Sequence, residues 1–421
     1  MWRISLFPSL LLGTIIFFSV PEDTGTLVPR AIYLTWTEDP TTTMVVDWHL
    51  DTEIPLTTLQ YRREGHTFWR PAPEATTFPF PFSTERDVYR VHLSGLLPGT
   101  SYEFRFGPQS RIYRFRTMPE TADEPIRIAA GGDTMHDRRW MRAMNSQVME
   151  HDPDFIVWGG DLAYADGRED KIDRWFDWFD AVTDTLIAAD GRAVPILVAI
   201  GNHEVRGGYT WGIPGYTQTD ATRAAAAPYF YTLFAMPGQP GYTVLDFGDY
   251  LSILLLDTNH TNPIGGVQTA WLQETLAART DVTHVVPVYH QPAWPSVRAF
   301  GESGSTAVRL NWVPLFEQYG VRVVFENHDH SYKRTVPIRE NLEAEDGIVY
   351  IGDGAWGVAP RQVKLPEATW YLERAETVRN AVIMTIHNDL QGFVAINPDG
   401  KVIDEVPMTP PVAKETTSDQ R

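Results

Sequence analysis

The sequence predicts an all-β domain over residues 28–119, followed by an α/β domain over residues 125–408. Short alternating or β-branched runs, separated by turn clusters, fill the first segment, which is typical of a β-sandwich. In the second segment, apolar strand-like runs alternate with helical stretches and end in polar tips. This pattern indicates an α/β sheet with its site on one edge. A polar linker from Pro119 to Pro125 separates the two patterns.

The composition is that of a globular protein with a strong acidic excess. The 421 residues are enough for two or more domains with large cores. The 54 acidic residues outnumber the 35 basic ones and give a formal charge of −19, which argues against a nucleic-acid partner because its phosphates would be repelled. A small phosphate ester can still bind where cations make one site positive. The chain has no cysteine, so disulfides and thiolate ligands are excluded.

The first 27 residues are expected to be a signal peptide or an N-terminal anchor. Arg3 precedes an apolar run over residues 6–20, and polar residues follow this run directly. We therefore expect a secreted or otherwise extracytoplasmic protein, periplasmic or at the cell surface, with no membrane contact beyond this segment. Residues 409–421 are polar and are expected to form a disordered tail. The sequence leaves the oligomeric state open.

The first domain is expected to contain six strands, and none of them carries a catalytic pattern. Residues 95–102 resemble the Gly-Leu-x-Pro-x-Thr-x-Tyr corner of fibronectin type III domains, which ends here at Tyr102. The expected strands are residues 32–36, 44–48, 58–61, 88–93, 102–106 and 112–116.

The second domain is expected to alternate strands with helices, and the helices should cover residues 138–151 and 172–189. The last apolar strands, residues 348–351, 382–386 and 393–396, are expected to close a sheet edge. The strands expected before them are residues 126–130, 154–157, 194–200, 251–256, 285–289 and 321–325.

A set of polar residues follows these strands, each near the point where an apolar run ends. The carboxyl ends of parallel strands meet at one edge of a sheet, where ligands bind, and the side chains found there are hard or borderline metal ligands. Each residue alone also fits ordinary turn or loop chemistry, but turn chemistry does not easily explain the whole ordered set. The sequence therefore predicts a metal site that draws on Asp133, Asp161, Tyr164, Asn202, His203, His290, His328 and His330.

The order of these blocks resembles that of the purple acid phosphatases, which belong to the calcineurin-like metallophosphoesterase superfamily. The likeness covers nearly the whole chain, because plant-type members also carry an N-terminal fibronectin type III-like domain. It implies that a fibronectin type III-like sandwich precedes an αββα sandwich, in which two mixed sheets are flanked by helices. The blocks are Gly132-Asp133, Gly160-Asp161-Leu162-Ala163-Tyr164, Gly201-Asn202-His203-Glu204, His290 and His328-Asp329-His330.

The resemblance also implies the metals and the reaction. It places Fe(III) at Asp133, Asp161, Tyr164 and His330, and a divalent ion (Zn, Mn or Fe) at Asp161, Asn202, His290 and His328, so that Asp161 bridges the two. The expected activity is that of an acid phosphatase, which hydrolyses small phosphate monoesters through attack by a metal-bound hydroxide. Asp161 and His203 are the expected catalytic residues, and His203 would contact a phosphate oxygen or assist the leaving group.

Two departures from the family pattern affect the loops that carry the ligands. The first block reads Asp133-Thr134-Met135 and lacks the usual glycine two residues after the aspartate. Asn327 stands where the family has glycine. Asparagine is expected to preserve the turn there, because it is among the few residues that tolerate a positive φ.

A third departure concerns the substrate side of the site. Residues 291–309 lack the histidine pair that plant-type enzymes carry after the ligand at position 290. Arg298 and Arg309 are the candidate replacements as phosphate contacts, and solvated loop charges are the alternative interpretation. Two other functions stay open at this point: a phosphodiesterase or nucleotide-cleaving relative with the same metals, and a non-catalytic surface protein that binds a partner.

Overall fold

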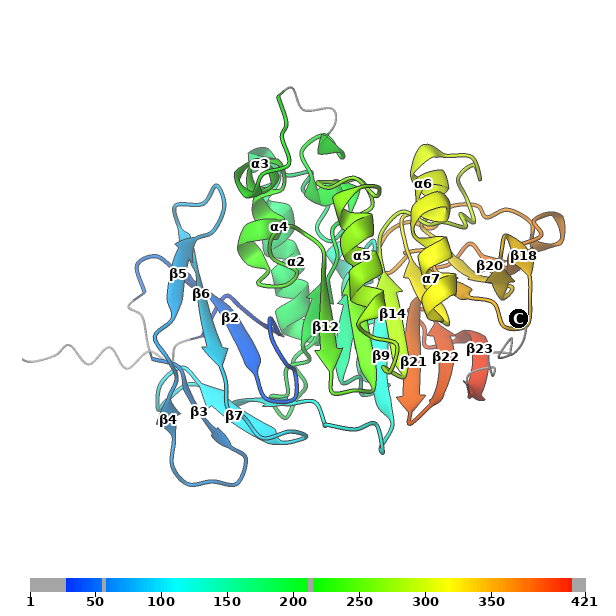
Figure 1. Ribbon diagram of the computed structural model, residues 1–421. Helices are drawn as coiled ribbons and strands as arrows, with labels where there is room; N and C mark the ends of the chain where they lie inside the picture. Colours follow the sequence, from blue (N-terminus) through cyan, green and yellow to red (C-terminus); the bar gives the residue numbers. More distant parts are fainter. Residues whose placement is uncertain (1–27, 55–57, 211–214, 411–421) are drawn as a thin grey trace, which may run out of the picture.

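The computed structural model describes residues 28–54, 58–210 and 215–410; the expected signal segment and nearly all of the expected tail lie outside these ranges. Two four-stranded antiparallel sheets form the N-terminal part (Figure 1). The first has the order β1 (Ala31–Thr35), β2 (Met44–Asp51), β6 (Arg86–Leu93) and β5 (Thr76–Pro79), and the second has the order β4 (Arg70–Pro71), β3 (Gln60–Arg63), β7 (Ser101–Arg105) and β8 (Tyr113–Arg116).

Aromatic side chains fill the core between these two sheets. Trp48 of β2 stacks on Tyr89 of β6 with ring centroids 5.5 Å apart, and it lies 5.1 Å from the ring of Phe106, which follows β7. The corner expected near the end of this part is present, because the hydroxyl of Tyr102 accepts a hydrogen bond from the backbone N–H of Leu97 at 2.8 Å. The all-β prediction for this part of the chain is confirmed.

The rest of the chain builds two larger mixed sheets, in which parallel and antiparallel strand pairs both occur. The six-stranded sheet has the order β11 (Ile196–Val198), β10 (Phe155–Trp158), β9 (Ile126–Gly131), β21 (Ala381–His387), β22 (Leu390–Ile396) and β23 (Val402–Thr409). The seven-stranded sheet has the order β12 (Thr243–Phe247), β13 (Leu251–Leu255), β14 (His284–Val288), β15 (Val323–Glu326), β19 (Val349–Gly352), β16 (Tyr332–Thr335) and β20 (Leu372–Glu376).

Helices cover the outer faces of both sheets, so the layers run helix, sheet, sheet, helix. Val157 and Val288, from different sheets, share the inner core, where the two sheets face each other. The six-stranded sheet is covered by α1 (Arg138–Met149), α2 (Ile172–Thr185), α3 (Asp220–Ala226) and α4 (Pro228–Leu233). The seven-stranded sheet is covered by α5 (Val267–Ala277), α6 (Ser303–Asn311) and α7 (Val313–Tyr319), and a short hairpin of β17 (Ile338–Arg339) and β18 (Leu342–Glu343) lies beyond it. The predicted αββα arrangement is confirmed.

The expectation that the last apolar strands close a sheet edge is wrong for all three of them, because β22 also lies inside its sheet, between β21 and β23. β19 lies inside the seven-stranded sheet between β15 and β16, and β21 pairs with β9 near the middle of the six-stranded sheet. Figure 1 shows β9, β21, β22 and β23 side by side. The physical reason is that β21 and β22 extend the parallel strands as an antiparallel addition, so that β23 becomes the edge.

The N-terminal sheets pack directly on the larger domain. Trp36, which follows β1, is fully buried and meets the rings of Phe155 and Phe247 edge-on, with centroids 5.8 and 5.7 Å away. The hydroxyl of Tyr33 donates a hydrogen bond to the carbonyl of Leu233 at 2.7 Å. The hydrophobic core is therefore continuous across the two parts of the chain. Among the described residues, no helix is both long enough and apolar enough to cross a membrane.

Candidate metal centre

The predicted ligand residues come together where the two large sheets end. In the six-stranded sheet, β9, β10 and β11 run parallel, and Asp133, Asp161 and Asn202 follow them. In the seven-stranded sheet, β14 and β15 run parallel, and His290 and His328 follow them. Because carboxyl ends of parallel strands share one edge, both sheets deliver their loops to one place.

One cluster joins Asp133, Tyr164 and His330. The Tyr164 hydroxyl lies 3.0 Å from Asp133 Oδ1 and 3.1 Å from His330 Nε2, and those two atoms are 2.9 Å apart. An oxygen of Asp161 lies within 4.8 Å of the donor atoms of Asp133 and His330. All four side chains are buried.

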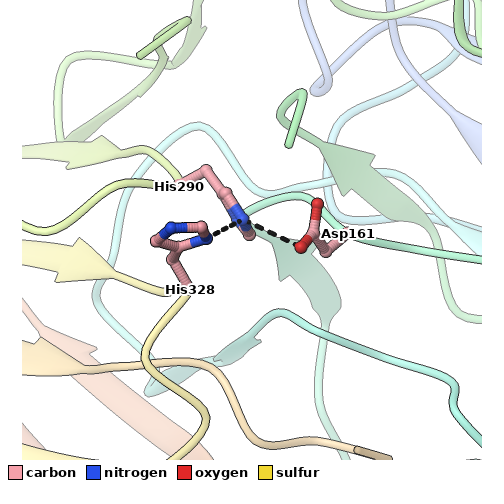
Figure 2. A group of neighbouring side chains, drawn as sticks. All are labelled: Asp161, His290 and His328. Atoms are coloured by element: carbon pink, nitrogen blue, oxygen red, sulfur yellow. Dashed lines mark hydrogen bonds and ion pairs between the residues drawn. The ribbon is translucent and has the colours of Figure 1, made fainter. Parts of the chain in front are cut away.

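A second cluster lies beside the first and shares Asp161 with it. His290 Nε2 lies 3.1 Å from Asp161 Oδ2, 3.2 Å from Asn202 Oδ1 and 3.0 Å from His328 Nδ1. Figure 2 shows the imidazole of His290 between Asp161 and His328. Asp161 therefore belongs to both clusters, as a ligand that bridges two ions would.

The hydrogen-bond chemistry of the second cluster fits a bound cation. His290 Nδ1 lies 2.8 Å from the carbonyl of Gly159, so Nδ1 carries the proton and Nε2 presents a lone pair in the neutral ring. In the neutral ring that lone pair faces carboxylate and amide oxygens, which also only accept, whereas without a cation the ring takes up a proton that Nε2 donates to Asp161. A positive ion among these atoms would satisfy all of them at once.

The electrostatics of the buried donors lead to the same conclusion. Burial alone would lower the pKa of His290, but the carboxylates of Asp161 and Asp133 raise it to about 9. Burial, together with the charges of Asp133 and Asp161, raises the pKa of Tyr164 well above its ordinary value. The phenolate therefore requires a strong positive charge beside it, and the carboxylates concentrate negative charge that a metal would neutralise.

The backbone around the donors is strained. Asp133, Asp161, Tyr164, His328 and His330 all have a positive φ, between 55° and 78°, which is uncommon for residues other than glycine. Such strain clusters at functional sites, where the surrounding structure holds it.

Glycines next to these residues leave room for the donors. A Cβ atom on Gly354 would overlap Asp133 Oδ2, and one on Gly201 would overlap Asp161 Oδ1. Both positions therefore require glycine, because any side chain there would occupy the space of a carboxylate.

Glu204 holds the loop that carries Asp161, a role that its position beside His203 in the sequence did not reveal. Its Oε2 accepts hydrogen bonds from the backbone N–H groups of Asp161 and Gly201, at 2.7 and 2.8 Å, and its Oε1 accepts one from Leu162 at 2.8 Å. The side chain is fully buried. One carboxylate therefore fixes two adjacent ligand loops.

His203 lies at the outer side of the cluster and remains 34% exposed. Its Nε2 is 4.0 Å from Asp161 Oδ2, and its Nδ1 is 2.5 Å from Asp166 Oδ1. Burial lowers the pKa of His203, but the hydrogen bond to Asp166 and the charge of Asp161 outweigh this effect and raise it. Asp166, two residues after Tyr164, was not among the predicted site residues; only its spacing from Tyr164 could have indicated it.

Two further histidines near the cluster were also missed. The exposed ring of His136 lies 4.5 Å from that of Tyr164 and 5.5 Å from that of His330. The buried ring of His260 lies 5.5 Å from that of His290. Neither ends a predicted strand, so the pattern that found the ligands did not apply to them.

The two predicted phosphate contacts are placed differently. Arg298 lies beside the cluster, where its Nη1 donates to the carbonyl of His328 and to Asp329 Oδ1, both at 2.7 Å. Arg309 instead donates to the loop carbonyls of Ala293 and Phe300 and covers the Phe300 ring. None of the contacts of Arg309 within the described ranges reaches the donor cluster, so the structure does not support its expected role as a phosphate contact.

Asn327 is accommodated for a different reason than the positive φ expected from the sequence. The positive φ belongs to His328, not to Asn327. The Asn327 side chain packs where a Cβ atom on Gly132 or Gly159 would stand, and its Nδ2 donates to the carbonyl of Tyr289 at 2.9 Å. Asparagine is accommodated because its neighbours are glycines.

Two family models match the chain. Residues 29–117 match the model described as purple acid phosphatase, N-terminal domain, and residues 126–332 match the model described as calcineurin-like phosphoesterase. The chain belongs to the purple acid phosphatase family. The family predicted from the sequence is confirmed, and the second match includes the segment with His328 and His330.

Two curated relatives place the family match in context. An uncharacterized protein of Mycobacterium tuberculosis is 28% identical over 352 residues, which are 74% of this chain and 63% of that protein. Purple acid phosphatase 21 of Arabidopsis thaliana is 27% identical over 294 residues, which are 67% of this chain and 62% of that protein. The chain therefore spans less than two thirds of the length of these relatives.

Two solved structures share the fold. The purple acid phosphatase PPD1 from yellow lupin (Lupinus luteus) seeds superposes with a TM-score of 0.72 at 18% identity, covering 89% of this chain and 73% of the lupin chain. A structure titled PhoD superposes with a TM-score of 0.63 at 14% identity, covering 90% of this chain and 92% of that chain. At these identities the likeness concerns the fold.

Proposed function

We propose that this protein is a binuclear metal-dependent acid phosphatase that hydrolyses small phosphate monoesters. The observation that carries the proposal is the Tyr164 hydroxyl, 3.0 Å from Asp133 and 3.1 Å from His330 inside a buried donor cluster. Its hydroxyl is a useful ligand only as a phenolate, and because burial and the nearby carboxylates raise its pKa, ionising it would need a strong Lewis acid. That requirement favours a trivalent ion over a divalent one at this position.

The proposed ions are Fe(III) in the cluster with Tyr164, and zinc, manganese or Fe(II) in the cluster with His290. Three negative donors (Asp133, Asp161 and Tyr164 as phenolate) face five positive charges, and the remaining positive charge suits an anionic phosphate ester. Bound metals would supply the activated water and neutralise charge on the phosphoryl group. The fully buried Asp161 would hold both ions in register.

His203 is the proposed group for the leaving-group oxygen. Asp166 accepts the hydrogen bond from Nδ1, which orients the ring and favours its protonated form. Nε2 can then present its proton to the substrate on the exposed side of the cluster. Arg298 adds positive charge near the His328 loop, but its Nη1 is already engaged with Asp329.

The test combines metal analysis with enzyme assays on purified protein. We expect iron and a second metal, a visible absorption band, and cleavage of phosphate monoesters with an optimum below neutral pH. Diester cleavage that far exceeds monoester cleavage would favour the diesterase alternative. Metal-loaded protein without any phosphoesterase activity would favour the non-catalytic alternative.

We further propose that the protein acts outside the cytoplasm. Support comes from Arg3 and the apolar run over residues 6–20, both of which precede the described residues. Mass spectrometry of protein from the extracytoplasmic fraction should find a cleaved or membrane-anchored N-terminus. Recovery of the protein only from the cytoplasm, with an intact N-terminus, would contradict the proposal.

A further inference from the structure

Two imidazole rings flank Tyr164 on the exposed side of the donor cluster. The ring of His203 lies 4.2 Å from that of Tyr164 at an interplanar angle of 35°, and the ring of His136 lies 4.5 Å away at 72°. His203 is 34% exposed, and His136 is exposed as well. The exposed side of the cluster therefore carries a histidine pair, although the loop over residues 291–309 supplies none.

The segment that carries His136 is held firmly in place. The backbone N–H of His136 donates to the carbonyl of Gly357 at 3.2 Å. From α2, Arg174 donates through Nη1 to the carbonyl of His136 at 3.2 Å and through Nε to that of Ala163 at 2.7 Å. One guanidinium therefore ties the His136 segment to the segment that carries Tyr164.

The hydrogen bonding of the His136 ring leaves one donor free. Its Nδ1 accepts a hydrogen bond from the backbone N–H of Ala359 at 3.4 Å, so the proton of the neutral ring lies on Nε2. No residue in the described part of the chain pairs with that Nε2. An exposed ring with a free N–H beside a predicted cation site is arranged to bind an anion.

We propose that His136 donates a hydrogen bond from Nε2 to an oxygen of the bound phosphate group, so that the phosphate lies between His136 and His203. This inference rests on the proposed phosphatase function and assigns a part of its substrate specificity. A monoester presents three terminal oxygens, enough for both imidazoles and for the cations, whereas a diester presents only two. The pair therefore favours monoesters.

A second role for His136 must be distinguished from this one. The ring packs against Tyr164 and His330, so it could serve only to hold these two ligands in position. A packing role depends on the shape of the ring and would show in the metal content. A phosphate contact depends on the N–H donor and would show in the affinity for phosphate.

Two variants of the full-length, metal-loaded protein separate these roles. His136→Phe keeps a ring against Tyr164 and removes the donor, whereas His136→Gln removes the ring and keeps an N–H donor. The measurements are the dissociation constant of inorganic phosphate by calorimetry, the iron content per chain, and KM and kcat for a monoester. His92→Gln, at an exposed position on β6, is the matched control.

We expect His136→Phe to weaken phosphate binding and raise KM by about tenfold or more, because a hydrogen bond to a charged group is lost, with the iron content unchanged. His136→Gln should retain much of the affinity, and His92→Gln all of it. Three results would each overturn the inference. The first is unchanged phosphate affinity in His136→Phe, and the second is a parent protein that binds no phosphate. The third is loss of iron in His136→Gln together with normal phosphate affinity in His136→Phe. Phosphate binding that depends on His136 without monoester hydrolysis would sink the proposed function and leave the contact standing.

Discussion

Replacing Tyr164 with phenylalanine removes one oxygen from the donor set and keeps the ring. The packing against the rings of His136 and His203, 4.5 and 4.2 Å away, is available to phenylalanine as well. The hydroxyl contacts with Asp133 and His330, at 3.0 and 3.1 Å, are not. The variant therefore separates a metal-ligand role from a packing role.

The structure sets the size of the two effects. In the metal-free protein, Asp133 Oδ1 and His330 Nε2 contact each other at 2.9 Å, so neither is left without a partner, and the loss of unfolding free energy should be only about 1 kcal/mol. Iron affinity should change far more, since the negative charges on the proposed ferric donors fall from three to two. Changing a residue that only supports a ligand typically costs about 10- to 100-fold in metal affinity, so removal of the ligand itself should cost more.

The assay is the visible spectrum together with the iron content per chain. A phenolate bound to ferric iron transfers charge to the metal on absorbing visible light, so the parent protein should be pink to violet and Tyr164→Phe colourless. Tyr332→Phe is the matched control, because Tyr332 is also buried and its hydroxyl donates to Asp404 at 2.7 Å. If Tyr164→Phe is as purple as its parent, or if the iron-loaded parent lacks any visible band, the reasoning is refuted.

Three more predictions follow from the contacts described. Asp161→Ala should lose both metals and all turnover, and elemental analysis that finds two metals per chain would contradict the shared position of Asp161. Asp166→Asn should lower kcat by about 10- to 100-fold with unchanged metal content and move the basic limb of the pH–rate profile to lower pH, because His203 loses the partner that raises its pKa; an unchanged profile would refute this. Burial raises the pKa of Asp47 to about 6 from 3.8, although Arg90 opposes the shift. The folded state therefore binds the proton more tightly, and the stability that this confers is present below about pH 4 and lost as the pH rises through 6, about 3 kcal/mol in all. Asp47→Asn should abolish this decline in urea unfolding measured from pH 4 to pH 7, and an equal decline in both proteins would contradict the assignment.

The sequence was informative about the site because its donors follow apolar strands in order. Asp161 and His290 stand at strand ends in the sequence, and parallel pairing turns such positions into neighbours in space. Asp166 and His136 lie farther along the loops that follow β10 and β9, beyond the residues that end the apolar runs. Their roles depend on side-chain directions set by loops with a positive φ, and single-sequence patterns do not encode those directions.

Other misses have physical causes of the same kind. β21 reads as an apolar run that fits either an edge or a central strand, although its almost continuous burial is typical of a strand covered on both faces. Arg309 is a cation in a loop near the site, and only the contacts with Ala293 and Phe300 reveal that it stabilises the loop. Asn327 fits because Gly132 and Gly159 leave room for its side chain. These glycines follow strands that are distant in the sequence, so a local pattern does not reveal the fit.

The burial of Trp36 against Phe155 and Phe247 couples the unfolding of the N-terminal sheets to that of the larger domain. Removing the N-terminal sheets would uncover part of both rings on the larger domain, at a cost of up to about 2 kcal/mol for each ring. The two halves should therefore melt in one cooperative transition. A catalytic half expressed alone should aggregate instead of working at reduced rate. The N-terminal sheets thus cover part of the hydrophobic core of the larger domain. The two parts should therefore be found together in one chain.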